Sequence, residues 1–210
     1  MSESVLVSAL LAIVGGFFDA YSYIARGRVF ANAETGNIVL MGYYIARGQV
    51  RTSLLYFIPI CSFAAGVLIT EYIRRKYGAY PKFHWRQRII LLELLFVFIA
   101  GLLPAGDWNL LANTMISFIC AMQVESFRKV KGDAYASTMC TGNLRSGSEQ
   151  LFKWFFDHDE RAKRRGARYM LIIACFIIGA IIGVFATNGF AEKAVLFCSL
   201  PLLLTFILML

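Results

Sequence analysis

The sequence has few of the residues that build metal centres or disulfide-linked scaffolds. It contains only two histidines, His84 and His158, and both lie in basic stretches between apolar runs. Its five cysteines show no Cys-x-x-Cys spacing, and all except Cys140 lie within apolar runs. A metal site of the zinc or iron type therefore has no obvious ligand set. We expect no metal, no cofactor and no disulfide.

Charged residues are also scarce. They make up 16% of the 210 residues, against roughly 25% in soluble domains. Hydrophobic residues make up 59%, and the mean hydropathy is +0.63. Six apolar runs approach or reach the roughly 20 residues that cross a bilayer: 4–25, 53–73, 89–104, 109–127, 168–187 and 194–210. The composition predicts an all-α, multi-pass membrane protein with a single membrane domain over residues 1–210. The first run lacks the features of a signal peptide, so we expect it to be a retained helix.

The net charge of +8 comes from basic residues in short loops, which indicates membrane topology rather than a nucleic-acid partner. Three clusters are expected to face the cytoplasm: Arg74, Arg75, Lys76, Lys82, Arg86 and Arg88; Arg128, Lys129 and Lys131; Arg161, Lys163, Arg164, Arg165 and Arg168. Both chain termini then lie in the cytoplasm. Four arginines run against this pattern, because the same topology places them on the outer side: Arg26, Arg28, Arg47 and Arg51.

The triplet Thr-Gly-Asn occurs twice, at Thr35-Gly36-Asn37 and at Thr141-Gly142-Asn143. Each copy follows a long apolar run, and an acid, Asp19 or Glu125, stands sixteen residues before the threonine. Such self-similarity predicts an internal repeat, with one copy in residues 1–104 and the other in residues 105–210.

A short segment follows the start of each triplet, at residues 36–48 and 142–157. The first has 13 residues and reaches roughly 20 Å, against about 30 Å of hydrocarbon. The second is polar and lies between two basic clusters that face the same side. We expect both to be re-entrant half-helices, with an interfacial or spanning position left open. Three true spans per copy then make the six transmembrane helices two inverted three-helix repeats.

The triplets could form a central site at the starts of these half-helices. There Thr is a good N-cap, Gly permits close backbone approach, and Asn supplies a polar side chain. Their positive dipole ends would face one another near the bilayer centre. The predicted substrate-binding residues are Thr35, Gly36, Asn37, Thr141, Gly142 and Asn143. The alternative is that each triplet only caps a helix buried in protein.

Acids inside apolar runs are costly and mark proton or ion sites. Asp19 is the best candidate, because it lies deep in its run. Glu125 lies near Arg128 and Glu93 near Arg88, so either carboxylate could instead reach the membrane surface. Arg145 is a candidate counter-ion for Asp19 or Glu125 if the second half-helix enters the membrane.

The segment Gly15-Gly16-Phe17-Phe18-Asp19-Ala20-Tyr21-Ser22-Tyr23, followed by residues 29–42 with the first triplet, resembles a known family pattern. It is similar to the YoaK-like family of small bacterial inner-membrane proteins of unknown function, and residues 137–144 resemble the same pattern. The likeness in length and hydropathy covers nearly the whole chain. The resemblance implies a bacterial inner (plasma) membrane location and no particular activity.

Two functions remain open. The first is a small-solute transporter or channel with the triplets at its centre, linked to protons through Asp19 and the other acids. The second is a non-transporting adaptor or regulatory protein whose basic loops recruit a partner or bind anionic lipid. An enzyme is not indicated, because Asp157-His158-Asp159 has no convincing nucleophile beside it. The predicted partners are the lipid bilayer and a small molecule or ion, with a homo-oligomer left open.

Overall fold

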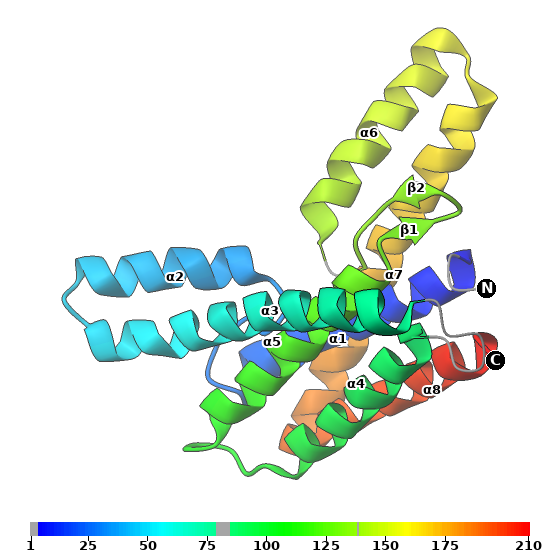
Figure 1. Ribbon diagram of the computed structural model, residues 1–210. Helices are drawn as coiled ribbons and strands as arrows, with labels where there is room; N and C mark the ends of the chain where they lie inside the picture. The colour runs from blue at the N-terminus through cyan, green and yellow to red at the C-terminus, as the bar shows by residue number, and fades with distance from the viewer. Residues whose placement is uncertain (1–3, 79–84, 138) are drawn as a thin grey trace.

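The computed structural model describes residues 4–78, 85–137 and 139–210 (Figure 1). The helices are α1 (Val5–Ala25), α2 (Glu34–Ala46), α3 (Val50–Tyr77), α4 (Trp85–Leu102), α5 (Asn109–Ser126), α6 (Cys140–Asp157), α7 (Glu160–Phe190), the 3-10 helix η1 (Ala191–Cys198) and α8 (Ser199–Leu208). A small antiparallel hairpin pairs β1 (Lys129–Val130) with β2 (Asp133–Ala134). The predicted all-α class is confirmed apart from this hairpin. Lys82, His84 and Thr138 lie outside the described residues.

The long helices pack in two close pairs, α1 with α7 and α3 with α5. Small residues permit this approach, since a Cβ added at Gly16 would come within 1.9 Å of the Phe176 carbonyl oxygen of α7. A Cβ at Gly66 would come within 2.5 Å of the Phe118 carbonyl oxygen of α5. Close packing of this kind is typical of helices in membranes, where dispersion contacts replace the hydrophobic effect.

The other helices complete the body of the molecule. α4 packs on α5, η1 and α8, and α8 also contacts α1. The main buried cluster lies among these helices and includes Leu11, Val97, Ile116, Val195 and Leu202, each fully buried. The interior is therefore apolar around the polar groups described below.

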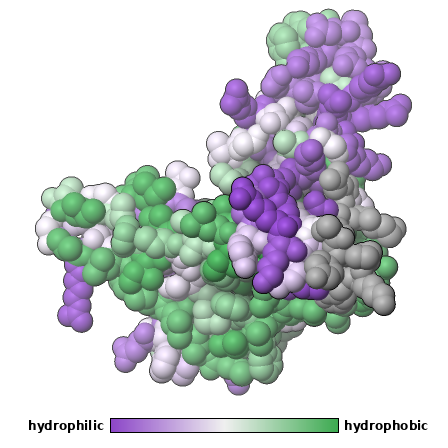
Figure 2. All heavy atoms as spheres, in the orientation of Figure 1, coloured by the Kyte–Doolittle hydropathy of each residue, from purple (hydrophilic) through white to green (hydrophobic). Residues whose placement is uncertain are grey.

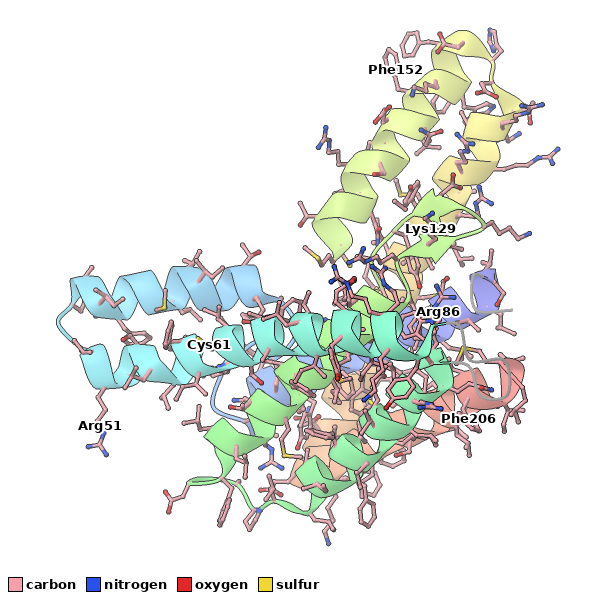
Figure 3. The ribbon with its side chains drawn as sticks, viewed as in Figure 1. Arg51, Cys61, Arg86, Lys129, Phe152 and Phe206 are labelled. Carbon is pink, nitrogen blue, oxygen red and sulfur yellow. The ribbon has the colours of Figure 1, made fainter. Side chains whose placement is uncertain are left out.

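Two arms extend from this body (Figure 1). The first arm is α2 with the part of α3 that packs on it, and the second arm is α6 with the part of α7 that packs on it. In each arm the two helices run antiparallel, so the start of the short helix lies toward the body. Figure 3 shows Arg51 at the free end of the first arm and Phe152 toward the free end of the second.

Within the part of the chain that the structure describes, three helical stretches are long and apolar enough to cross a membrane: Val5–Ala25, Val50–Tyr77 and Glu160–Leu208. The last stretch has 49 residues and contains α7, η1 and α8. The exposed surface of the body is rich in Leu, Ile and Phe side chains. These features define a helical membrane protein.

Candidate functional site

The asparagine of each triplet holds the loop in front of its helix. The Asn37 Oδ1 accepts a hydrogen bond from the Phe30 amide at 3.1 Å, and its Nδ2 donates to the Phe30 carbonyl at 2.6 Å. The Asn143 side chain makes the same pair of bonds with Ala136, at 3.2 and 2.6 Å. Both asparagines are buried. In both places an amide side chain therefore clamps the backbone seven residues earlier.

The threonines do not cap the helices, so this expectation is wrong. α2 and α6 each begin one residue before the threonine of the triplet. The N-cap residues are Ala33 and Met139, and neither supplies a side-chain hydrogen bond. The reason is that the asparagine clamp fixes where the loop ends, which moves Thr35 and Thr141 into the first turn of their helices.

Each triplet also lines a cavity. A cavity of about 510 Å³ lies beside Thr35 and Gly36, with Tyr23, Phe30, Tyr44 and Tyr56 among its walls. A smaller one of about 240 Å³ lies beside Gly142 and Asn143. Thr141 is exposed on α6. Four of the six predicted residues thus line two separate cavities, one at the start of each short helix, and Asn37 and Thr141 line neither.

Asp19 connects α1 to the loop that leads into α2. Its Oδ1 accepts hydrogen bonds from the backbone amides of Asn32 and Ala33 at 3.2 and 3.1 Å. Its Oδ2 accepts from the Asn32 side chain at 3.4 Å. The carboxylate also lies within electrostatic range of Cys140, the first residue of α6. Asp19 is therefore buried close to the starts of both short helices.

Glu93 does not reach the membrane surface, and the expectation that it could do so is wrong. Its side chain is fully buried on α4. Neither of its carboxylate oxygens has a hydrogen-bond partner among the described residues. The carboxyl group lies within electrostatic range of the Cys120 thiol on α5. A carboxyl group in such a place is a functional candidate.

Polar residues that the sequence reasoning missed surround these acids. Glu34 lies at the start of α2, where its Oε2 accepts a hydrogen bond from Asn37 Nδ2 at 2.9 Å. A buried polar stripe follows one face of α5: Asn113, Ser117, Cys120 and Gln123. The Cys120 thiol lies within electrostatic range of three acids: Asp19, Glu34 and Glu93. The helical spacing of this stripe inside an apolar run was the available signal.

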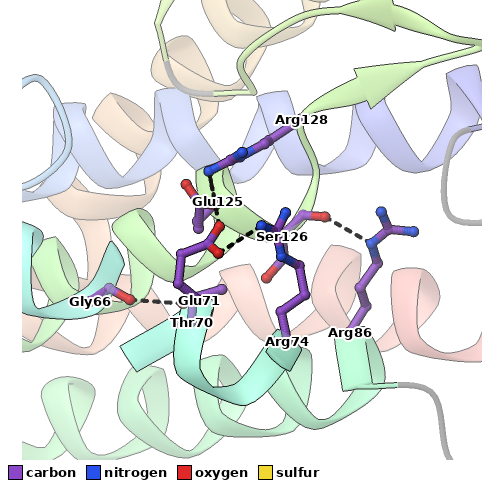
Figure 4. A network of polar contacts seen from close by, with 8 residues as sticks. All are labelled: Gly66, Thr70, Glu71, Arg74, Arg86, Glu125, Ser126 and Arg128. Carbon is purple, nitrogen blue, oxygen red and sulfur yellow. Dashed lines mark hydrogen bonds and ion pairs between the residues drawn. The ribbon is translucent and has the colours of Figure 1, made fainter. Parts of the chain in front are cut away.

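Glu125 and Arg145 lie apart from this centre. Glu125 forms an ion pair with Arg128, which also contacts Glu71 at 3.1 Å (Figure 4). Arg145 is exposed on α6 and lies near Glu149. The prediction of Arg145 as a counter-ion is therefore wrong, because Arg128, three residues along the chain, takes that position beside Glu125.

Arg26 is fully buried and not a surface charge of the outer side. Its guanidinium donates to Tyr21 Oη at 2.7 Å and to the carbonyl oxygens of Ala100 and Leu103 at 2.8 and 2.9 Å. It also contacts the Pro104 carbonyl and Asn109 Oδ1. These carbonyls end α4, where a cation is favoured by the helix dipole. Arg26 thus caps α4 and ties it to α1.

The helical fold and the apolar surface together define a helical membrane protein. The chain belongs to the family described as "Protein of unknown function (DUF1275)", which matches residues 7–208. It is similar to the UPF0700 transmembrane protein YoaK of Bacillus subtilis (strain 168), with 26% identity over 190 residues, 87% of this chain and 83% of the relative. The resemblance to the YoaK-like family is confirmed. No solved structure matches the chain.

Proposed function

We propose that the protein is a small-solute transporter of the bacterial inner membrane, built from two inverted halves and linked to protons. The observation that carries the proposal is a group of three acids, the buried Asp19 and Glu93 and the half-buried Glu34, which all lie within electrostatic range of the Cys120 thiol. Carboxyl groups at membrane depth mark ion or proton pathways. Glu93 and Asp19 are the proposed proton-binding groups.

The order of the helices supports two related halves. α2 begins at residue 34 and α6 at residue 140, while α4 spans residues 85–102 and η1 with α8 spans residues 191–208. These elements are separated by the same 106 residues that separate the triplets. The first helix of each half packs on the third helix of the other, α1 on α7 and α5 on α3. Such exchange is what two intertwined repeats would produce.

Contacts within the arms support re-entrant half-helices. Tyr44 of α2 stacks on Tyr56 of α3 with ring centroids 5.5 Å apart, so the start of α2 lies about ten residues further along α3, beside its middle. Gly147 of α6 packs on Tyr169 and Met170 of α7. The start of α6, seven residues earlier, then lies beside the middle of the apolar part of α7. Half-helices that start near the bilayer centre occur at transporter binding sites.

The test is proton movement in proteoliposomes that enclose a pH-sensitive dye. A panel of small polar solutes and inorganic anions is added outside, and solute-dependent changes in internal pH are recorded. Glu93→Gln should abolish the solute-dependent signal, because the amide cannot bind and release a proton. Glu149→Gln removes an exposed carboxylate of the second arm and serves as the control. Unchanged coupling in a folded Glu93→Gln protein would overturn the assignment.

A second candidate is the adaptor function, which the second arm favours. Figure 2 shows this arm to be mainly hydrophilic, whereas the first arm is mainly hydrophobic. Exposed basic residues line its α7 side: Arg161, Lys163, Arg164 and Arg165. If the protein acts through this surface, neutralising these residues should abolish its cellular effect while Glu93→Gln leaves the effect intact. The transport proposal requires the opposite pair of results.

A further inference from the structure

A basic cavity lies apart from the central acids, where α3, α4, α5 and β1 meet. Its volume is about 310 Å³. It is lined by Arg74, Trp85, Arg86, Glu125, Ser126, Arg128 and Lys129. Four of these residues are cationic and one is acidic. The cavity therefore favours an anion, and it lies at the basic end of the chain's apolar helices.

Part of this charge is already balanced within the protein. Arg128 pairs with Glu125 and Glu71, and Arg74 pairs with Glu71 at 2.6 Å. Lys129 of β1 is exposed, and no ion pair is recorded for it among the described residues. Arg86 Nε donates a hydrogen bond to the Ser126 carbonyl at 2.8 Å, which brings the guanidinium to the cavity wall. The two acids leave a positive excess at the cavity.

Ser126 supplies a second, independent feature. Its hydroxyl oxygen is buried, and it has no hydrogen-bond partner among the described residues. Figure 4 shows Ser126 between Arg74, Arg86 and Arg128, and Arg86 of α4 and Lys129 of β1 line the same cavity. A buried hydroxyl without a partner is costly, and an oxygen-rich anion in the cavity would satisfy it.

We propose that this cavity binds a phosphate group, with Lys129, Arg86 and the Ser126 hydroxyl as its contacts. A phosphate has several acceptor oxygens, which suit a set of guanidinium, ammonium and hydroxyl donors. The group could belong to an anionic lipid or to a soluble phosphate. Trp85 in the cavity wall places an aromatic ring where lipid headgroups meet acyl chains. Basic cavities between membrane helices bind anionic headgroups in this way.

Trp85 makes the site observable. Trp108→Phe and Trp154→Phe leave it as the single tryptophan of the chain. In reconstituted protein, brominated phosphatidylglycerol should quench Trp85 more than brominated phosphatidylcholine does if the phosphate belongs to lipid. Lys129→Gln should reduce this preference about fivefold, as expected for one basic residue near a charged headgroup. Ser126→Ala should also reduce it.

Lys131→Gln is the matched control, because Lys131 lies in the same hairpin turn and does not line the cavity. In a second experiment, inorganic phosphate is titrated into delipidated protein in detergent and the melting temperature of the protein is followed. A rise that depends on Lys129 and not on Lys131, without a lipid preference, would assign the site to soluble phosphate. The proposal is overturned if Lys129→Gln and Ser126→Ala change the lipid preference and the phosphate-dependent rise in melting temperature no more than Lys131→Gln does. These outcomes are independent of proton coupling at Glu93.

Discussion

The two arms start alike and end differently. In both, an asparagine clamps the backbone seven residues earlier, and a short helix then runs back along a long one. The first arm exposes apolar side chains such as Ile38, Val39 and Ile45, whereas α6 carries Arg145, Glu149 and Lys153. Figure 2 shows the contrast. The same backbone device thus begins one helix with a mainly apolar exposed surface and another whose exposed surface carries charges.

The acids at matching positions differ as well. Asp19 binds the loop before α2, while Glu125 pairs with Arg128. In the first half Ser22 Oγ accepts a hydrogen bond from the Ala31 amide at 3.0 Å, and the matching position in the second half is Arg128. In the second half the β1–β2 hairpin and a 2.8 Å bond from Gln123 to Ser137 hold the loop instead. In the second half, an arginine thus stands where the first half has a loop-binding serine, and Glu125 pairs with that arginine.

The largest effect is expected at Arg26, where the two halves differ, because the matching residue of the second half is Gly132. Arg26→Met should lower the free energy of unfolding by about 3–5 kcal/mol, because several buried acceptors lose their donor. The measurement is denaturant unfolding in detergent micelles. Arg28→Met, which changes an exposed arginine of the same loop, should have little effect. Equal stability of the two variants would contradict the capping role.

The next effect tests the shared clamp. Asn37→Ala and Asn143→Ala should each cost about 2–4 kcal/mol, since each leaves a backbone amide and carbonyl without a partner. Asn188→Ala, on an exposed face of α7, is the control and should change stability by less than about 0.5 kcal/mol. Thermal unfolding of the three proteins measures this. A large loss in only one half would show that the two clamps are not equivalent.

A smaller difference is expected between the two acids. Asp19→Asn should cost about 1–3 kcal/mol, because the new NH2 group cannot accept the hydrogen bond that Oδ2 takes from the Asn32 side chain, and a neutral oxygen accepts less strongly from the amides of Asn32 and Ala33. Glu125→Gln should cost less, about 0.5–1 kcal/mol, since Arg128 keeps its contact with Glu71. Melting temperatures at one pH and salt concentration compare them. If Glu125→Gln were the more damaging, the ion-pair network would outweigh the loop contacts.

The smallest effect lies on the surface of the second arm. The hydrogen bond from Lys153 holds the pKa of Glu149 below its usual value of 4.5. Because the folded pKa is lowered, the stabilisation is present above the unfolded pKa and is lost as pH falls through the folded value. Lys153→Gln should remove this acid dependence. Melting curves across the acid range, at low and high salt, would show a difference that salt screens.

Much of the fold followed from local sequence. The apolar runs located the long helices, because polar groups are costly to bury in lipid. This cost adds up over consecutive residues, so it can be recognised in the local sequence. The two triplets marked the starts of α2 and α6 to within one residue. The sequence showed Arg128 close to Glu125 but offered Arg145 as the counter-ion, so the ion pair between Glu125 and Arg128 was not predicted.

By itself, then, the sequence determined a helical membrane protein with two short helices, each with an asparagine-bearing triplet at its start. Only the tertiary structure decided what the central side chains do. Arg26 meets the end of α4 more than 70 residues later, and Glu93 faces a polar stripe on another helix. Such partners lie far apart in the sequence and meet only because the chain folds back on itself. A local pattern of hydropathy or charge does not indicate which distant residues will meet.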